Sequence, residues 1–338
     1  MFAYAVRRIL IGLAMLVVMT LITFLLFMNN TTASVLASCG KNCQPEQKAI
    51  IAKTLGYDDP VYVQWGKFLK GVVAGRNFPD DPALVADHPE LVAHCPAPCL
   101  GYSFKNSNFV WDVMKDAMWV SISIAVVAFA IWIIIGVLLG IIAALKRGTW
   151  IDKVIVGVTL VIFAFPTFFI GQLLYVFLAI KTGWFAIPSY TPIADGGVFT
   201  WLGGVILPAI TLAVFYMAGY VRMTRAFVLE TSTEDYIRTA QAKGLSARAV
   251  IGKHTFRAAL TPIVTMAGMD LALVLGGAPI TESVFNFNGL GKLAVTATRE
   301  FDLPINIGIV VFLSAFVILA NVVVDIAYAF IDPRVSVK

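Results

Sequence analysis

Four cysteines, the residues of this sequence best suited to form covalent or metal-linked clusters, occur as two pairs of the form C-x3-C. They are Cys39 with Cys43 and Cys95 with Cys99. On an oxidising face of a membrane, cysteines in such a pattern form disulfides, and four cysteines allow three pairings. The other chemistry open to them is a four-thiolate zinc site, whose ligands are typically two to four residues apart. We expect two disulfides and no metal site, and the spacing leaves the pairing open.

Catalytic signatures of enzymes are missing from the sequence. The three histidines, His88, His94 and His254, form no H-E-x-x-H metal motif. Residues 286–293 have the outline of a phosphate-binding loop. However, Asn286 stands in place of its first glycine, and Leu293 in place of the serine or threonine that holds magnesium. We therefore expect no catalytic residue, no cofactor and no nucleotide hydrolysis in this chain.

Several polar residues lie inside long apolar stretches, and Asp270 is the only charged residue of its stretch, 258–281. A charge at the middle of a membrane costs about 2.5–3.5 kcal/mol on insertion scales, so this side chain should face protein or a water-filled cavity. An interhelical hydrogen bond and a place along a transport path are both open interpretations. Further candidates for lining such a path are Gln172, Tyr216, Tyr220 and Asn321.

The elements that must position these residues are membrane helices, because the 338 residues are 59% hydrophobic and 13% charged, with a mean hydropathy of +0.85. Soluble globular chains have about 45–50% apolar and about 25% charged residues. A helix needs about 20 mostly apolar residues to cross a membrane. Six windows qualify, which predicts an all-α membrane protein with six transmembrane helices. They are Ile9–Met28, Ala117–Leu145, Val154–Ile180, Thr200–Val221, Ala258–Thr281 and Ile305–Val324.

The distribution of lysine and arginine predicts the orientation of these helices. With the N-terminus inside, more than half of the 25 lie in cytoplasmic segments, while the two short outer loops hold only Lys181, Lys292 and Arg299. We therefore expect a multi-pass protein of the bacterial inner membrane with both termini in the cytoplasm and residues 29–116 outside. The first window exceeds the roughly 7–15 apolar residues of a cleaved signal, which favours a retained helix.

The chain divides into three parts: a first helix at 1–28, an extracytoplasmic segment at 29–116 with all four cysteines, and a five-helix core at 117–338. Gly136 and Gly140 lie one turn apart in the second window, which predicts a close approach by another helix. Prolines at 166, 208 and 262 should interrupt or kink three further windows.

A charged cytoplasmic loop at 222–258 has the pattern of a short exposed helix. Residues 231–235 (TSTED) offer hydroxyls and acids for a helix start, and residues 236–243 follow as an amphipathic helix. Gly244 can supply the left-handed residue that ends it. A helix that is small on one side and cationic on the other predicts a docking surface, and the alternative is a solvated loop.

The loop also resembles a known motif. Residues 235–245 (DYIRTAQAKGL), with His254, Arg257-Ala258-Ala259-Leu260 and Pro262, resemble the coupling loop of the permeases of ATP-binding-cassette (ABC) importers, in the dipeptide and oligopeptide branch. The general motif has a glutamate and two alanines ahead of its glycine. Arg238-Thr239-Ala240 stands there in this chain, as in the peptide branch.

Further matches to this family run through most of the chain, apart from an extra stretch between Gly75 and Gly101 that holds Cys95 and Cys99. The matching segments and residues are Arg7–Leu10, Pro45–Gln47, Leu55–Pro60, Glu282–Asn286, Gly289–Gly291, Asp325, Tyr328 and Asp332–Arg334.

The resemblance implies a permease subunit of the first ("B") type that works with several partners. These are a homologous second permease, two cytoplasmic ATPases that bind ATP and Mg, and an extracytoplasmic protein that delivers peptides. Asp270 could then meet the amino group of a peptide. Gly289, Leu290 and Gly291 are implied as a contact for the binding protein. The implied ATPase contact is Tyr236, Ile237, Arg238, Thr239, Ala240, Lys243 and Gly244.

Other functions stay open at this point. A stand-alone secondary transporter or channel would use Asp270 and Asp325 to bind protons or cations, but the coupling-like loop and the lack of an internal repeat disfavour it. A membrane-embedded enzyme would need a nucleophile–base pair or a metal cluster. Within the importer family, nickel chelates and haem are alternative substrates.

Overall fold

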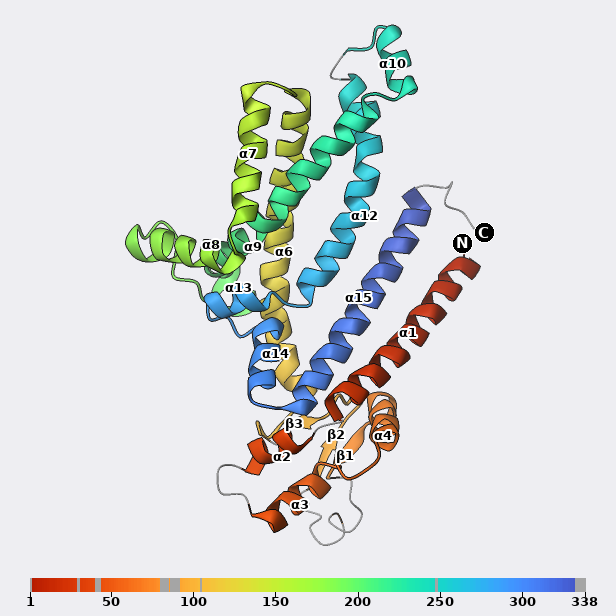
Figure 1. Ribbon diagram of the computed structural model, residues 1–338, viewed down its shortest axis with the longest axis vertical. Helices are drawn as coiled ribbons and strands as arrows, with labels where there is room; N and C mark the ends of the chain where they lie inside the picture. The colour runs from red at the N-terminus through yellow and green to blue at the C-terminus, as the bar shows by residue number, and fades with distance from the viewer. Residues whose placement is uncertain are drawn as a thin grey trace. The chain divides into compact units, whose positions relative to one another are not determined.

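The computed structural model is mostly helical and describes residues 2–28, 31–39, 44–79, 85, 92–103, 105–246 and 249–331 (Figure 1). Among these residues, five helices are long and apolar enough to cross a membrane, and a bent helix pair makes a sixth candidate. The prediction of six spans agrees with this result when the pair counts as one. The five helices are α1 (Phe2–Met28), α6 (Val110–Leu145), α9 (Ile193–Thr231), α12 (Phe256–Leu275) and α15 (Leu303–Ile331).

The bent pair differs from the single continuous helix expected at 154–180. α7 (Trp150–Ala164) and α8 (Thr167–Leu174), which continues into the π-helical segment η2 (Tyr175–Lys181), meet at 102°. Phe165 and Pro166 between them are extended, with ψ of 138° and 142°. Proline lacks the N–H that would continue the helix and disfavours helical angles at the residue before it, so the break falls where the sequence places Pro166.

The span expected at 258–281 is also shorter in the structure. α12 ends at Leu275, and Gly277 follows with a φ of 107°. Glycine adopts this angle without the steric cost that other residues have, so the chain turns here. A separate short helix, α13 (Pro279–Val284), then begins at a proline in its first turn.

The first loop, between α1 and α6, is folded. Its described residues include three helices, α2 (Thr32–Cys39), α3 (Pro45–Thr54) and α4 (Val61–Ala74), and two antiparallel strand pairs. In α3, Pro45 opens the first turn and Gln44 with Gln47 forms a capping box, which satisfies backbone donors at the start of the helix. The strand pairs are β1 (Arg76–Phe78) with β2 (Ala93–Cys95), and β3 (Tyr102–Ser103) with β4 (Asn108–Phe109).

The chain forms two compact units, residues 1–119 with 288–338, and residues 120–287. In the first unit α1 packs along α15. Gly12 permits the close approach, because a Cβ added there would lie 3.0 Å from Cγ2 of Ile318. The core of this unit also takes in α4, the start of α6 and α14 (Leu290–Arg299), and includes Phe24, Phe68 and Met114.

In the second unit α7, α8, α12 and α13 pack against α9. α6 approaches α9 through the two glycines singled out in the sequence. A Cβ added to Gly140 would lie 2.6 Å from Cβ of Thr224 and 2.8 Å from the carbonyl oxygen of Val221, and one added to Gly136 would lie 2.9 Å from Cβ of Tyr220. The close approach predicted for these glycines is therefore confirmed, and it is made to α9 of the same chain.

Replacing Gly140 with leucine should destabilise the second unit. The nearest atoms belong partly to the backbone of α9, so rotation of a neighbouring side chain cannot make room. Overpacking of this kind typically costs 1–3 kcal/mol, and we expect about 3 kcal/mol and a clearly lower melting temperature for the detergent-purified protein. Gly157→Leu in α7 is the matched control, because a Cβ added there meets nothing within 4 Å. Equal melting temperatures for the two variants would contradict the packing described.

Candidate functional site

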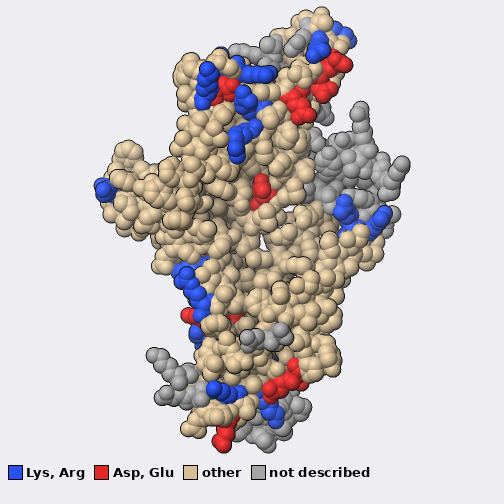
Figure 2. All heavy atoms as spheres, in the orientation of Figure 1, with Lys and Arg blue, Asp and Glu red and all other residues tan. Residues whose placement is uncertain are grey.

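The predicted docking helix is present as α10 (Asp235–Ala242), which stands beyond the ends of α9 and α12 (Figure 1). Figure 2 shows lysine, arginine and acidic side chains gathered at this end of the second unit, near α7, α9 and α10. The chain returns from α10 to α12 through the π-helical segment η3 (Val250–Thr255). The second unit thus carries a short charged helix on two long apolar ones.

The two faces of α10 have different surroundings. Ile237 and Ala240 are buried against Val250 of η3 and hold the helix in place. Because these two positions are three apart, they share a face, and the other side is left exposed. Of the seven residues implied as the ATPase contact, only these two are buried. The exposed ones are Tyr236, Arg238, Thr239, Lys243 and Gly244.

The sequence predicted how α10 starts and how it ends. Gly244 has a φ of 75°, which confirms the left-handed residue expected after the helix. Two of the hydroxyls expected to cap the start of α10 instead bind the end of α9. Ser232 and Thr233 donate to the carbonyl oxygens of Val228 and Glu230 in the last turn of α9, at 2.6 and 2.7 Å. They therefore complete the preceding helix, whose last carbonyls have no partner within the helix.

A buried ion pair lies at the same end of the second unit, and the sequence analysis missed it. Arg225 of α9 donates through Nε and Nη2 of its guanidinium to Oδ1 and Oδ2 of Asp152 in α7, at 2.7 and 2.8 Å. The backbone N–H of Gly148 donates to the same carboxylate at 3.0 Å. Asp152 is 4% exposed. This bidentate pair fixes α7 against the part of α9 that leads into α10.

Three of the residues predicted to line a path come together inside the second unit. The hydroxyl of Tyr220 donates to Oδ2 of Asp270 at 2.6 Å and so joins α9 to α12. Tyr216, one turn earlier on α9, stacks on Trp132 of α6 with ring centroids 4.6 Å apart. Trp132 is fully buried. It was not predicted, because nothing in its local sequence separates it from a core tryptophan.

The other two candidates for the path are not part of this cluster. Gln172 is exposed on α8, and Asn321 is exposed on α15 in the first unit. The side chain of Asp325 lies outside the described residues.

The implied contact at 289–291 is buried. Gly289, Leu290 and Gly291 lie inside the first unit, with Leu290 at 0% exposure in its core. The cause is local: Gly289 caps α14, so its neighbours form the first turn of a helix that packs on α15. In this chain these three residues are packed inside the first unit, and their contact with the binding protein stays a prediction.

Glu282, an acidic residue of α13 in the second unit, has a structural role. Its side chain is fully buried, and its carboxylate accepts hydrogen bonds from the hydroxyl of Ser121 at 2.7 Å and the backbone N–H of Ala278 at 3.1 Å. It therefore closes the start of α13 and ties it to α6.

The three cysteines that the structure describes are in disulfides. Cys95 and Cys99 are bonded to each other across a short turn after β2, and Cys39 is also disulfide-bonded, while Cys43 lies outside the described residues. The backbone N–H of Cys99 donates to the carbonyl oxygen of Gly71, which fastens the turn to α4. Among the described residues no cluster of histidine, cysteine or acidic side chains could hold a metal ion.

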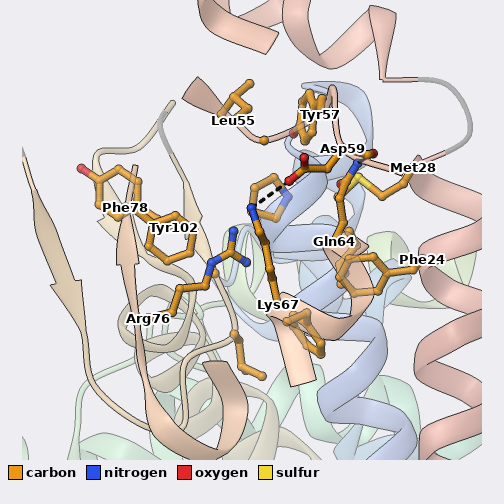
Figure 3. Close-up of a pocket in the computed structure, with 16 residues that line it drawn as sticks. Phe24, Met28, Leu55, Tyr57, Asp59, Gln64, Lys67, Arg76, Phe78 and Tyr102 are labelled. Carbon is orange, nitrogen blue, oxygen red and sulfur yellow. Dashed lines mark hydrogen bonds and ion pairs between the residues drawn. The ribbon is translucent and has the colours of Figure 1, made fainter. Parts of the chain in front are cut away.

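The first loop also encloses a pocket of about 60 Å³ (Figure 3). Aromatic rings of Phe24, Phe68 and Phe78 form part of its wall. Lys67 pairs with Asp59 at 2.7 Å on one side, and the Arg76 guanidinium lies 4.5 Å from the centre of the Phe78 ring. The pocket thus combines an apolar wall with two cations and one carboxylate.

Tyr57 of this pocket is expected to resist ionisation. Burial raises its pKa to about 12, the charge of Asp302 adds to the rise, and a hydrogen bond with Ser34 opposes it. The folded pKa lies above the unfolded value of about 10, so the stability that Tyr57 contributes is complete below pH 10 and is lost as the pH rises from 10 to 12. The loss amounts to at most about 3 kcal/mol.

Tyr57→Phe should remove this component of the pH dependence. We expect the wild-type protein to lose more thermal stability than this variant between pH 9.5 and roughly 11.5. Tyr62→Phe is the control, because Tyr62 is exposed on α4, and it should behave as the wild type does. A slope that is the same in all three proteins would contradict the assignment.

Both parts of the chain match families of transport proteins. Residues 136–337 match the family described as binding-protein-dependent transport system inner membrane component, and residues 1–125 match the N-terminal family of such membrane components. The first match alone covers more than half of the chain. The chain belongs to this transport family.

Similar proteins cover the whole length. A peptide transport system permease protein of Brucella abortus (strain 2308) is 33% identical over 335 residues, 99% of both chains. The dipeptide transport system permease protein DppB of Escherichia coli (strain K12) is 29% identical over 361 residues, 100% of both. These matches confirm the family resemblance seen in the loop motif.

A solved structure supports the fold class. The MetNI methionine ABC transporter in an inward-facing conformation gives a TM-score of 0.51 at 16% identity, covering 66% of this chain and 97% of that one. The fold is therefore that of an ABC importer permease, as predicted.

Proposed function

We propose that this chain is a permease subunit of an ABC importer that moves peptides into the cytoplasm. The observation that carries the proposal is the full-length similarity to peptide and dipeptide permeases. The exposed helix α10 supports it, because a permease that hydrolyses no nucleotide needs a surface on which an ATPase can act. The subunit itself would have no catalytic residue and no cofactor.

The partners follow from this role. A second, homologous permease would complete the path, and two ATPase subunits that bind ATP and Mg would dock on α10 through Tyr236, Arg238 and Lys243. Ile237 and Ala240 would serve the docking indirectly, because they anchor the helix on η3. Movement of the ATPases would then be passed through α10 to α9 and α12.

The orientation belongs to the same proposal. The positive charges at the α7, α9 and α10 end of the second unit support a cytoplasmic position for that end. Both termini would then lie in the cytoplasm and the first loop would lie outside. An oxidising exterior supports this placement, since the first loop contains disulfides. There the folded first loop would meet the substrate-binding protein.

Reconstitution tests the function. The chain is combined with its second permease, ATPases and binding protein in lipid vesicles, and uptake of radiolabelled dipeptides and longer peptides is followed with and without ATP. We expect ATP-dependent uptake that stops when the ATPases are inactivated. Uptake that continues with inactive ATPases would favour a stand-alone transporter. Uptake of only nickel chelates or haem would correct the substrate.

A further inference from the structure

Asp270 has one carboxylate oxygen in a hydrogen bond that the structure describes. Oδ2 accepts this hydrogen bond from Tyr220. Among the described residues no further hydrogen bond or ion pair of Asp270 is seen, and the side chain is only half-buried. Asp270 lies within an apolar span, Ala258–Leu275.

A carboxylate in this position needs a positive group or water beside it, because facing hydrocarbon costs about 2.5–3.5 kcal/mol. Two cations of α9 that the structure describes are engaged elsewhere. Arg225 binds Asp152, and Arg222 lies over the ring of Phe163 at 4.3 Å. A positive group on a bound substrate would meet the need of Asp270 for a counter-charge.

The surroundings of Asp270 favour an ammonium group. Tyr216 is partly exposed on α9, one turn from Tyr220, whose hydroxyl binds Asp270. Its ring is held by the stack on fully buried Trp132. A fixed aromatic ring beside a carboxylate attracts a primary ammonium by cation–π attraction and by a charge-assisted hydrogen bond.

We propose that Asp270, with Tyr216 beside it and Tyr220 orienting it, binds the terminal ammonium group of a peptide in transit. This inference rests on the proposed function and adds to it a chemical requirement on the substrate. Asp270 and Tyr216 would contact the peptide, whereas Tyr220 and Trp132 are positioning residues that hold the other two.

The test uses a photo-reactive phenylalanine analogue at Met269, which is 43% exposed next to Asp270. The complete complex of permeases and ATPases is placed in nanodiscs without binding protein, so that the selectivity of that protein does not enter. Cross-linking is compared between a radiolabelled tripeptide with a free amino group and the same tripeptide acetylated. We expect at least a tenfold preference for the free amine.

Three variants separate recognition from structure. Asp270→Asn should reduce the preference to about one, and Asp270→Glu should restore most of it. Asp195→Asn, at an exposed position in the first turn of α9, should leave it unchanged. A preference that survives in Asp270→Asn would overturn the proposal, as would equal labelling by both peptides in the wild type. Equal loss of both signals with a lower melting temperature would assign Asp270 to interhelical bonding alone and would also overturn it.

The proposed function fails separately. It fails if the wild-type complex with its binding protein imports no peptide in the presence of ATP. An importer that works while its Asp270 site shows no preference contradicts only the present inference.

Discussion

Gly244→Val is expected to abolish peptide uptake while leaving the chain in the membrane at near-normal levels. Gly244 has a φ of 75°, and an added Cβ there meets nothing within 4 Å, so the cost is purely conformational. The left-handed region costs ordinary residues about 1–2 kcal/mol, and a β-branched residue is a clear outlier there. α10 has only eight residues. Because so short a helix is marginal without its packing, this cost should displace it from η3.

Two further variants of the loop decide whether the backbone conformation at Gly244 causes the loss of uptake. Gly252→Val is the matched control, because Gly252 also meets nothing within 4 Å but does not have a positive φ. It should retain uptake. Gly244→Asn should retain more uptake than Gly244→Val, since asparagine tolerates the left-handed region. The measurements are ATP-dependent uptake in vesicles and co-purification of the ATPases. Unchanged uptake in Gly244→Val would show that α10 is not the coupling element.

The membrane spans could be predicted from sequence because apolar length alone determines them. The errors fell where glycine and proline change the backbone. Pro166 could be recognised as an interruption, but a sequence window does not give the 102° angle between α7 and α8. Gly277 and Pro279 end one helix and start another inside a continuous apolar window. Windows average over such positions, so they find spans better than they find ends.

In the candidate sites, features fixed by neighbouring residues could be predicted, whereas contacts between residues far apart in the sequence could not. Gly244 was predictable because a helix end is a local event. The bond between Tyr220 and Asp270 joins residues 50 positions apart, and no spacing rule connects them. The burial of Leu290 could not be predicted, because a motif match does not report burial. Trp132 gave no signal, since a tryptophan in an apolar stretch is ordinarily part of the core.

Arg225→Ala is expected to lower the stability of the protein strongly. Its loss of stability should be larger than that of Asp152→Ala. Asp152 is nearly fully buried, whereas the Arg225 side chain is 28% exposed. Removing the arginine leaves a buried carboxylate with the Gly148 N–H as its remaining hydrogen bond in the structure. A carboxylate left without its partner costs more than the loss of the whole interaction, because its desolvation is no longer compensated. Removing the aspartate leaves a cation that can reach solvent, so we expect a smaller loss of stability.

Arg225→Ala should also impair transport, because Arg225 holds the part of α9 that leads into α10. We expect Arg225→Ala to melt at a lower temperature and to lose most ATP-dependent uptake. Arg225→Lys should fall between it and the wild type, since lysine keeps the charge but not the bidentate geometry. Lys146→Ala, an exposed cation of the neighbouring turn between α6 and α7, is the control and should change neither quantity. If the double variant Arg225→Ala with Asp152→Ala were less stable than the wild type by the sum of the two single losses, the two residues would be energetically independent, and the pair would not be the tie between α7 and α9.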